Sequence, residues 1–325
     1  DAANSMESFL GTVKLYSRQG DSAGDQFAVS GSPKDDPSTG RRPAAVAGTF
    51  YPADDVSRES QVDQLLSDLQ PIEKRSALAI MVPHAGLRFS GRVAADVWRR
   101  VQVPDRVLII GPKHTRDGAD WAIAPHDAWQ LATSTSIAGD VQTAKELCEC
   151  LPGMKLDRLA HAREHGIEVH LPIMHRICPE SRLTAIAMNG GTPKDFQKLA
   201  GALAAWMREQ VDPPLLVISS DMNHFAEDKE NRRRDRLALD AVAGGDGMEL
   251  LRVCESEKIS MCGQVPAAIV MMTLSELGVP SQSIEVAYAT SADNGGDPNR
   301  VVGYAGVLWY PATPVAALLS VSRLT

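Results

Sequence analysis

Apolar runs of strand length alternate with amphipathic helical segments along most of this chain, beginning at Arg42. This alternation is typical of α/β proteins, in which helices pack on a mainly parallel sheet. We therefore predict a three-layer αβα single domain around a mainly parallel or mixed sheet. The expected strands lie near residues 77–83, 106–111, 121–125, 182–188, 214–220, 284–289 and 301–309, and the expected helices near residues 57–69, 91–100, 139–149, 166–176, 193–209, 230–243, 247–256 and 264–277.

The two ends of the chain lack the alternating pattern. Residues 1–41 are rich in Ser, Gly, Asp and Pro, a composition that does not bury a large apolar surface. We expect a mobile N-terminal arm over residues 1–41, a single domain over 42–310 and a C-terminal connector over 311–325.

Composition and charge exclude several classes of protein. The chain has 325 residues and a formal net charge of -8, so no basic surface for nucleic acid is expected. No stretch approaches the roughly eighteen apolar residues of a membrane span, and we expect a cytoplasmic protein. The five cysteines are few for this length and odd in number, which argues against a disulfide framework.

Two histidines follow closely on apolar runs. His84 lies in the segment 81–86 and His114 in the segment 110–115, each after a run typical of a buried strand. Ligands bind α/β proteins in the crevice beyond the carboxyl ends of the strands. A single histidine at such a place often does no more than bond to backbone. Because the context occurs twice, we interpret both side chains as parts of one site.

A third apolar run leads into Ser219, and Asp221 and His224 follow it. An aspartate beside an imidazole fixes the tautomer of the ring and raises its basicity, which suits a general acid/base pair or the surroundings of a metal. Alternatively, Ser220 or Asp221 caps a short helix that begins at Met222. The sequence leaves both interpretations open.

The segment from residue 161 to residue 172 is dense in titratable groups. It lacks the H-E-x-x-H order of a zincin, so that assignment fails. Glu164 and His165 are the better candidates for the pocket, whereas His161 and His170 are expected to be structural.

Cys262 stands immediately before Gly263 and an apolar helical segment. The free amides and dipole of a helix N-terminus favour the thiolate, which is a good metal ligand or nucleophile. The alternative is an inert buried cysteine, as expected for Cys254. Together with His84 and His114, Cys262 would complete a three-ligand set with open coordination positions, which is typical of catalytic metal sites. Iron(II) is favoured, with copper and zinc as competitors because thiolate softens the site.

Several motifs, in their order and spacing, resemble the Memo family, whose bacterial members are called AmmeMemoRadiSam system protein B. They are Arg-Pro at 42–43, Ala-Gly-Thr-Phe-Tyr-Pro at 47–52, Pro-His-Ala-Gly at 83–86, Gly-Pro-Lys-His at 111–114, the run 164–172, Ser-Ser-Asp-Met-Asn-His at 219–224, and Cys-Gly at 262–263. The resemblance covers about residues 42–310. It implies a fold like that of the class III extradiol dioxygenases, with the metal site at His84, His114 and Cys262. It also makes His224 the counterpart of the dioxygenase acid/base, while Cys262 replaces the glutamate that is their third ligand.

Residues and resemblance together leave more than one function open. We expect a metal-dependent oxidoreductase in which the three ligands hold iron or copper. His224 would be the acid/base, and Asp221 and His165 would line a cleft that takes a small molecule or a peptide group. The alternatives are a non-catalytic peptide- or metal-binding protein and a zinc-dependent hydrolase. The family also implies a radical-SAM protein and an AMMECR-type protein as functional partners. This sequence has no Cys-x3-Cys-x2-Cys run for an iron–sulfur cluster, so it would be the partner of a radical-SAM enzyme and not that enzyme itself.

Overall fold

The computed structural model describes residues 40–132, 134–279 and 281–312. Residues 1–39 of the expected arm lie outside the described residues. Residues 313–325 of the expected connector also lie outside them. At the two ends of the described residues, Arg41 belongs to strand β1 (Arg41–Arg42) and Pro311 belongs to strand β12 (Val301–Pro311).

A nine-stranded sheet runs through the described residues in the order β10-β12-β2-β9-β3-β8-β4-β7, and β11 pairs with β12. The inner strands β2, β9, β3 and β8 are parallel, whereas β12 is antiparallel to β2 and β4 is antiparallel to β8. The predicted α/β class with a mixed sheet is confirmed. The strands of this sheet, besides β12, are β2 (Ala79–Val82), β3 (Arg106–Pro112), β4 (Trp121–Ile123), β7 (Lys155–Leu156), β8 (Arg182–Met188), β9 (Leu215–Ser219), β10 (His224–Ala226) and β11 (Ser281–Thr290).

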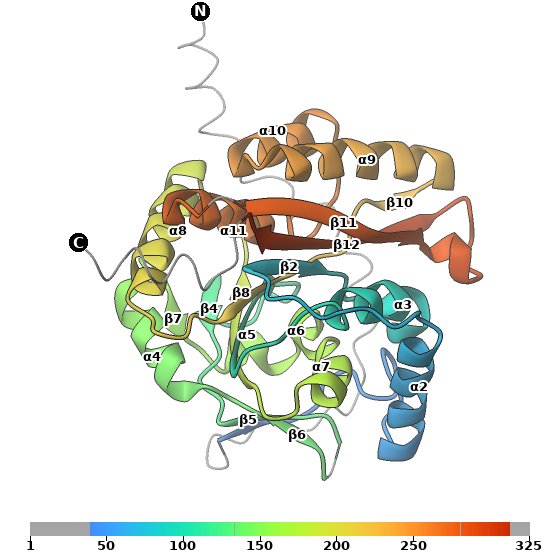
Figure 1. Ribbon diagram of the computed structural model, residues 1–325, viewed down its shortest axis with the longest axis horizontal. Coiled ribbons are helices and arrows are strands. Elements are labelled where there is room, and N and C mark those ends of the chain that lie inside the picture. Colours follow the sequence, from blue (N-terminus) through green and yellow to red (C-terminus); the bar gives the residue numbers. More distant parts are fainter. Residues whose placement is uncertain (1–39, 133, 280, 313–325) are drawn as a thin grey trace, which may run out of the picture.

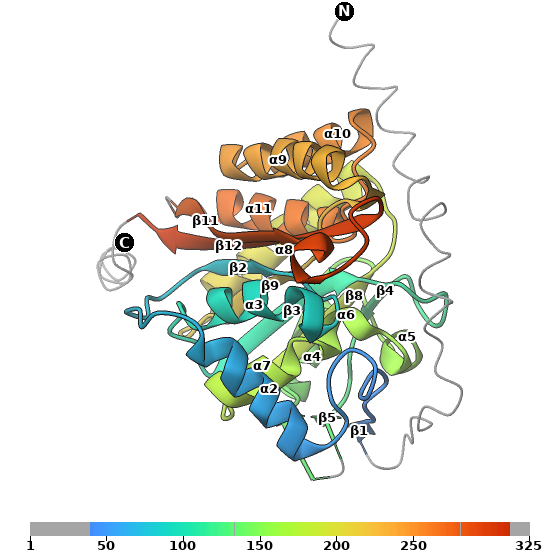
Figure 2. The same ribbon diagram turned by 90° about the vertical axis from the view of Figure 1, so that its right-hand side faces the viewer.

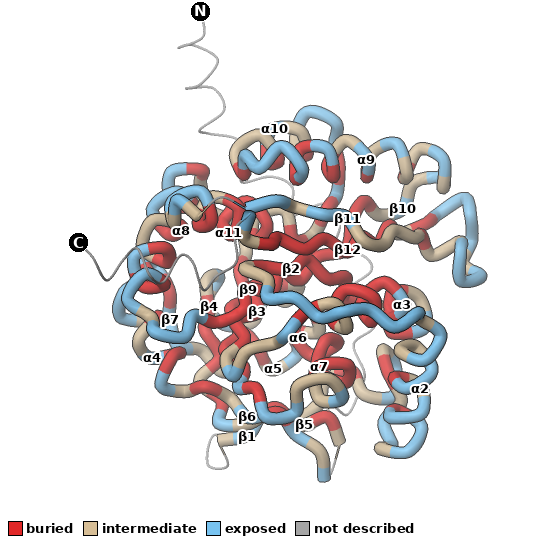
Figure 3. Tube along the Cα trace, in the orientation of Figure 1, coloured by how far each residue is buried: buried red, intermediate tan, exposed pale blue. Residues whose placement is uncertain are grey.

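Helices cover both faces of the sheet (Figure 1 and Figure 2). Successive strand residues point to opposite faces, so Met81 and Ile110 join one apolar core cluster while Ile80 and Ile109 join another. Burial is concentrated along these central strands (Figure 3). The first cluster packs against α4 (Val141–Cys150), α8 (Pro193–Arg208), α9 (Asp228–Gly244), α10 (Gly247–Ser256) and α11 (Gln264–Leu277), and the second against α2 (Asp55–Ser67), α3 (Leu87–Trp98) and α7 (Leu171–Ile177). Among the described helices, none is both long and apolar enough to span a bilayer.

One expected helix and several short strands differ from the prediction. The segment expected as a single helix over residues 166–176 is divided into α6 (His165–Glu168) and α7, and α5 (Leu159–Ala162) precedes it. Pro172 has no N–H to donate to the carbonyl of Glu168, which favours a break there. The sequence also does not predict β1, β7, β10, β5 (Ala128–Gln130) or β6 (Ser136–Ala138), because two or three residues show no period. Strands β1, β5 and β6 form a separate small sheet.

The parallel order of β2, β9 and β3 brings three strand ends to one edge of the sheet. In register, Val82 of β2 pairs with Ser219 of β9, and Ile110 of β3 pairs with Ile218. The loops that leave these strands carry the histidines and the aspartate singled out in the sequence. Cys262 lies in the loop before α11, which begins two residues later. The amide of Asp221 donates to Sγ of Cys262, so this loop also lies at the same edge.

Candidate metal centre

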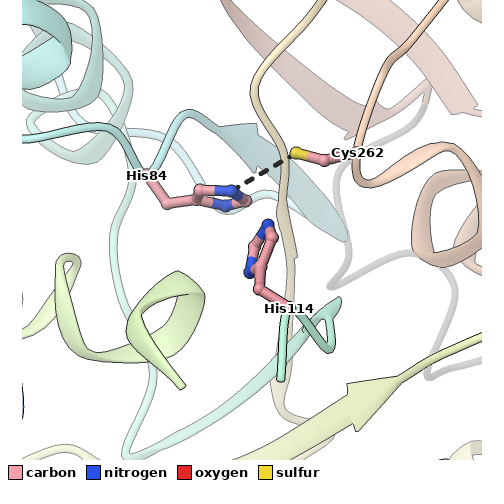
Figure 4. A group of neighbouring side chains, drawn as sticks. All are labelled: His84, His114 and Cys262. Atoms are coloured by element: carbon pink, nitrogen blue, oxygen red, sulfur yellow. Dashed lines mark hydrogen bonds between the residues drawn. The ribbon is translucent and has the colours of Figure 1, made fainter. Parts of the chain in front are cut away.

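Three side chains from three separate loops converge at this edge (Figure 4). His84 follows β2, His114 follows β3, and Cys262 precedes α11. One ligand atom from each lies within 4.8 Å of the others, and Nε2 of His84 is 3.3 Å from Sγ of Cys262. The His84 and His114 rings are 5.1 Å apart between centroids. The structure thus brings together the residues that the sequence analysis grouped as metal ligands.

Glu164 holds the ring and the backbone of His114. Its Oε1 is 2.7 Å from Nδ1 of His114, and its Oε2 accepts a 2.6 Å hydrogen bond from the His114 amide. The carboxylate is fully buried and also accepts from the amide of Gly166. Because an ionised carboxylate only accepts, His114 donates from Nδ1, which leaves Nε2 as the ring nitrogen that can bind a metal once it has lost its proton.

The charges of this pair stabilise each other. Burial alone would raise the pKa of Glu164, but the charge of His114 and its hydrogen bond outweigh burial and lower that pKa to about 2. Burial likewise opposes the charging of His114, yet Glu164 and a hydrogen bond with Cys262 raise its pKa well above the usual value. The carboxylate therefore stays ionised beside the ring that it orients.

Asp221 organises the loops that carry His84 and Cys262. Its Oδ1 accepts hydrogen bonds from the amides of His84, at 2.8 Å, and of Ala85, at 3.2 Å. Its own amide donates to Sγ of Cys262 at 3.2 Å. Burial raises the pKa of Asp221 to about 6. Residues 221–223 form a loop, so the alternative in which Ser220 or Asp221 caps a helix beginning at Met222 is wrong.

His224 begins β10 and is held by the residue two positions before Cys262. Its amide donates to Oγ of Ser260, and its Nδ1 is 2.8 Å from the Ser260 carbonyl oxygen. A carbonyl only accepts, so the ring donates from Nδ1 and Nε2 keeps a lone pair. Burial lowers the pKa of His224 to about 4, and the nearby charge of His114 acts in the same direction. The ring is therefore neutral near pH 7; its role as acid/base stays a prediction.

His165 begins α6 and packs beside both candidate imidazole ligands. Its ring stacks on His114 with centroids 4.2 Å apart, and it lies 5.5 Å from the ring of His84. The ring of Phe50 is 4.9 Å from the ring of His165. Burial, aided by the charge of His114, lowers the pKa of His165 to about 3. Sequence reasoning placed His165 in the pocket but did not single out Phe50, whose only signal was its place in the motif at residues 47–52.

A buried ion pair fixes the segment that carries Glu164 and His165. Nη1 of Arg42 lies 2.5 Å from Oε2 of Glu168, and both side chains are fully buried. Arg42 also donates to the carbonyl oxygens of His161 and Glu164, at 2.8 Å and 2.7 Å. The Glu168 carboxylate accepts further hydrogen bonds, from the amides of Ala45 and Val46 and from the hydroxyl of Tyr51. Sequence reasoning missed this pair.

His161 and His170, expected to be structural, are both buried. Nε2 of His161 lies 3.2 Å from the carbonyl oxygen of Ala122, and the carbonyl of His161 accepts from Arg42 of the buried ion pair. His170 instead contacts Ser219, whose hydroxyl also reaches His84. His170 and Ser219 therefore adjoin the candidate centre, and no periodic pattern in the sequence indicates this contact.

Comparison with known proteins identifies relatives along most of the chain. The family model described as Memo-like protein matches residues 42–308. A MEMO1 family protein of Aquifex aeolicus is 34% identical over 275 residues, covering 82% of this chain and 98% of the relative. MEMO1 family proteins of Ignicoccus hospitalis and Sulfolobus acidocaldarius are 32% and 31% identical, over 82% and 81% of this chain and 97% of each relative. The chain therefore belongs to the Memo family, as its motifs indicated.

Proposed function

We propose that this Memo-family protein binds one metal ion through His84, His114 and Cys262 and is a non-haem iron or copper redox enzyme. The observation that carries the proposal is the convergence of two imidazole nitrogens and one sulfur within 4.8 Å from three separate loops. The alternatives are a protein that uses the same cleft to bind a peptide or metal without turnover, and a zinc-dependent hydrolase.

The donor atoms fit a shared ion. Ligand atoms bonded to one metal at about 2.0–2.3 Å lie roughly 3–4 Å apart, and the 3.3 Å separation of His84 Nε2 and Cys262 Sγ falls in this range. Burial raises the pKa of the Cys262 thiol, so without a cation the sulfur favours its neutral form. A bound cation favours the thiolate, because a coordinating thiol is deprotonated.

The donor set narrows the choice of metal. Imidazole and thiolate suit iron, copper and zinc and disfavour magnesium and calcium. Three protein ligands leave coordination positions open, as in catalytic centres. An iron or copper ion bound there would supply redox chemistry at those positions.

The surrounding residues would act on the substrate. His224 presents a neutral imidazole whose Nε2 is free to take a proton, while its Nδ1 is held by the Ser260 carbonyl. His165 stacks on the ligand His114, Phe50 packs against His165, and Asp221 bonds to the loops that carry His84 and Cys262. A positioned base is superfluous for binding alone, which favours an enzyme over a binding protein.

The substrate and partners follow from the family alone. We propose a small molecule or a peptide group as substrate, and a radical-SAM protein and an AMMECR-type protein as functional partners in the cytoplasm. The charge of -8 gives no support for a nucleic-acid partner.

Metal analysis after anaerobic reconstitution tests the proposal. The protein is incubated separately with iron(II), copper and zinc, desalted, and analysed for bound metal, together with Cys262→Ser and the control Cys150→Ser. Cys150 is an exposed cysteine away from the centre, so its variant should retain metal like wild type. We expect about one ion per chain in wild type and a strong loss in Cys262→Ser, since a neutral hydroxyl replaces an anionic soft donor. Wild type that binds none of the three metals would refute the proposal.

A further inference from the structure

The hydroxyl of Ser219 lies between two buried histidines and a backbone carbonyl. Its Oγ is 2.7 Å from Nδ1 of His84 and 2.8 Å from Nε2 of His170, and it donates to the carbonyl oxygen of Gly166. Ser219 is fully buried, and His84 and His170 are each 1% exposed. Buried polar groups of this kind must satisfy their hydrogen bonds with one another.

Counting protons fixes the direction of each hydrogen bond. A serine hydroxyl has one proton to donate and two lone pairs to accept with, whereas a carbonyl oxygen can only accept. The Ser219 proton therefore goes to Gly166, and both rings must donate to Ser219. His84 accordingly carries its proton on Nδ1, and His170 carries one on Nε2.

The unpaired nitrogen of His170 supports this count. In the described residues, Nδ1 of His170 is buried without a hydrogen-bond partner. In the alternative Nδ1–H tautomer, Nδ1 would be a buried donor without a partner. Nε2 would then present a lone pair to a lone pair of the Ser219 hydroxyl, which is repulsive. The Nε2–H tautomer avoids both penalties.

We propose that Ser219 is a positioning residue that fixes His84 as its Nδ1–H tautomer, and that His170 occupies the remaining lone pair of Ser219. Nε2 of His84 then presents its own lone pair toward Cys262, 3.3 Å away. This consequence for metal binding rests on the proposed function, whereas the tautomer itself does not. A hydrogen bond to the second ring nitrogen is the usual way in which a protein orients a histidine ligand.

Gly166 connects this arrangement with the other imidazole. Its carbonyl accepts from Ser219, which orients His84, and its amide donates to Oε1 of Glu164, which orients His114. A Cβ on Gly166 would lie 3.1 Å from that Oε1 and 3.5 Å from Nδ1 of His84. One residue thus bonds to the acceptors of both candidate ligands, and a glycine leaves room for the two rings.

Nitrogen-15 NMR of the metal-free wild-type protein tests the tautomer directly. Chemical shifts of histidine ring nitrogens distinguish a protonated nitrogen from one with a lone pair, and the variants His84→Gln and His170→Gln assign the signals. We expect His84 to be protonated at Nδ1 only and His170 at Nε2 only. A His84 signal protonated at Nε2 would overturn the proposal whether or not the chain binds a metal.

Metal titration then tests the consequence for binding. Ser219→Ala removes the acceptor of His84 and should weaken metal affinity by about 10–100-fold. Ser181→Ala is the matched control, because Ser181 is also buried and its hydroxyl donates to a carbonyl, that of Pro104, in another part of the fold. Wild-type affinity in a folded Ser219→Ala protein would overturn the positioning role.

Variants of His170 separate positioning from packing. His170→Gln retains an N–H donor for Ser219, and we expect its metal affinity to stay near wild type. His170→Leu fills the space without a donor and should weaken affinity, though less than Ser219→Ala. Equal affinities of the Gln and Leu variants would contradict the part assigned to His170. Failure of wild type to bind metal would instead count against the proposed function and leave the tautomer measurement decisive for this inference.

Discussion

Two groups of buried polar atoms lie in neighbouring parts of this fold and differ in how they are paired. Around Arg42 and Glu168, all three guanidinium nitrogens donate to oxygens, and the carboxylate accepts from four protein groups. In the candidate metal centre, two imidazole nitrogens and a sulfur converge instead. The charges and hydrogen bonds of an ion pair are balanced within the pair. Nitrogen and sulfur ligand atoms that converge on one point are instead best stabilised by a cation. The difference separates a framework that holds the loops from a site that can bind.

The largest effect is expected for the proposed base, on turnover alone. His224→Gln should keep the metal and lose about 10²–10⁴-fold of turnover, the usual contribution of a positioned acid/base. Elemental analysis measures the metal, and consumption of a substrate identified by screening measures turnover. If His224→Gln lost the metal while Cys262→Ser kept it, the two roles would be exchanged and the site would be closer to a three-histidine zinc centre.

The framework should respond in the opposite way, through stability. Glu168→Gln leaves the Arg42 guanidinium buried without its anion and should lower the free energy of unfolding by about 3–5 kcal/mol. Urea unfolding of the metal-free protein measures this change. The double variant Arg42→Met/Glu168→Met removes both charges and should recover part of the loss. A change below about 1 kcal/mol in Glu168→Gln would contradict the view that this pair holds the fold together.

Glu164 belongs to both regions and should show an intermediate effect. Glu164→Gln keeps the shape of the side chain but loses the charge that orients His114, so metal affinity should fall by about 10–100-fold. Glu59→Gln, at an exposed position on α2, is the control and should leave affinity unchanged. Undiminished affinity in Glu164→Gln would show that His114 needs no carboxylate to act as a ligand.

The smallest expected effect is on the pH dependence of stability, through a framework histidine. Burial, with the charges of His126 and Arg42, lowers the pKa of His161 to about 3 in the folded chain. The unfolded chain therefore binds more protons, and this contribution to stability is complete above about pH 6.5 and is lost as the pH falls toward 3. In His161→Gln, the slope of unfolding free energy between pH 4 and pH 6 should be shallower by up to about 1.4 kcal/mol per pH unit. An unchanged slope would mean that His161 does not titrate on unfolding.

Local patterns account for much of the fold. The predicted helices over 247–256 and 264–277 and the predicted strand over 182–188 coincide with α10, α11 and β8. These elements carry enough residues to show a period and end at clear signals, such as Gly278 after α11. The helix expected over 166–176 fails because Pro172 cannot donate to the carbonyl of Glu168 and instead lies in the first turn of α7.

The candidate site likewise has a part that local patterns predict and a part that they do not. The predicted strand ends indicated that His84 and His114 would lie together, because the carboxyl ends of parallel strands share one edge of the sheet. The partners that orient these rings were harder to predict, because Glu164 is 50 positions from His114 and Ser219 is 135 positions from His84. No periodicity in a single sequence reports such a contact. Arg42 and Glu168, 126 positions apart, were missed for the same reason.

X-ray absorption at the metal edge of the reconstituted protein identifies and counts the atoms bonded to the ion, and so tests whether the three side chains bind it together. We expect one sulfur at about 2.3 Å and at least two imidazole nitrogens at about 2.0–2.1 Å around a single metal, with the sulfur lost in Cys262→Ser. A metal in wild type surrounded only by nitrogen and oxygen would contradict the claim that His84, His114 and Cys262 form one binding site.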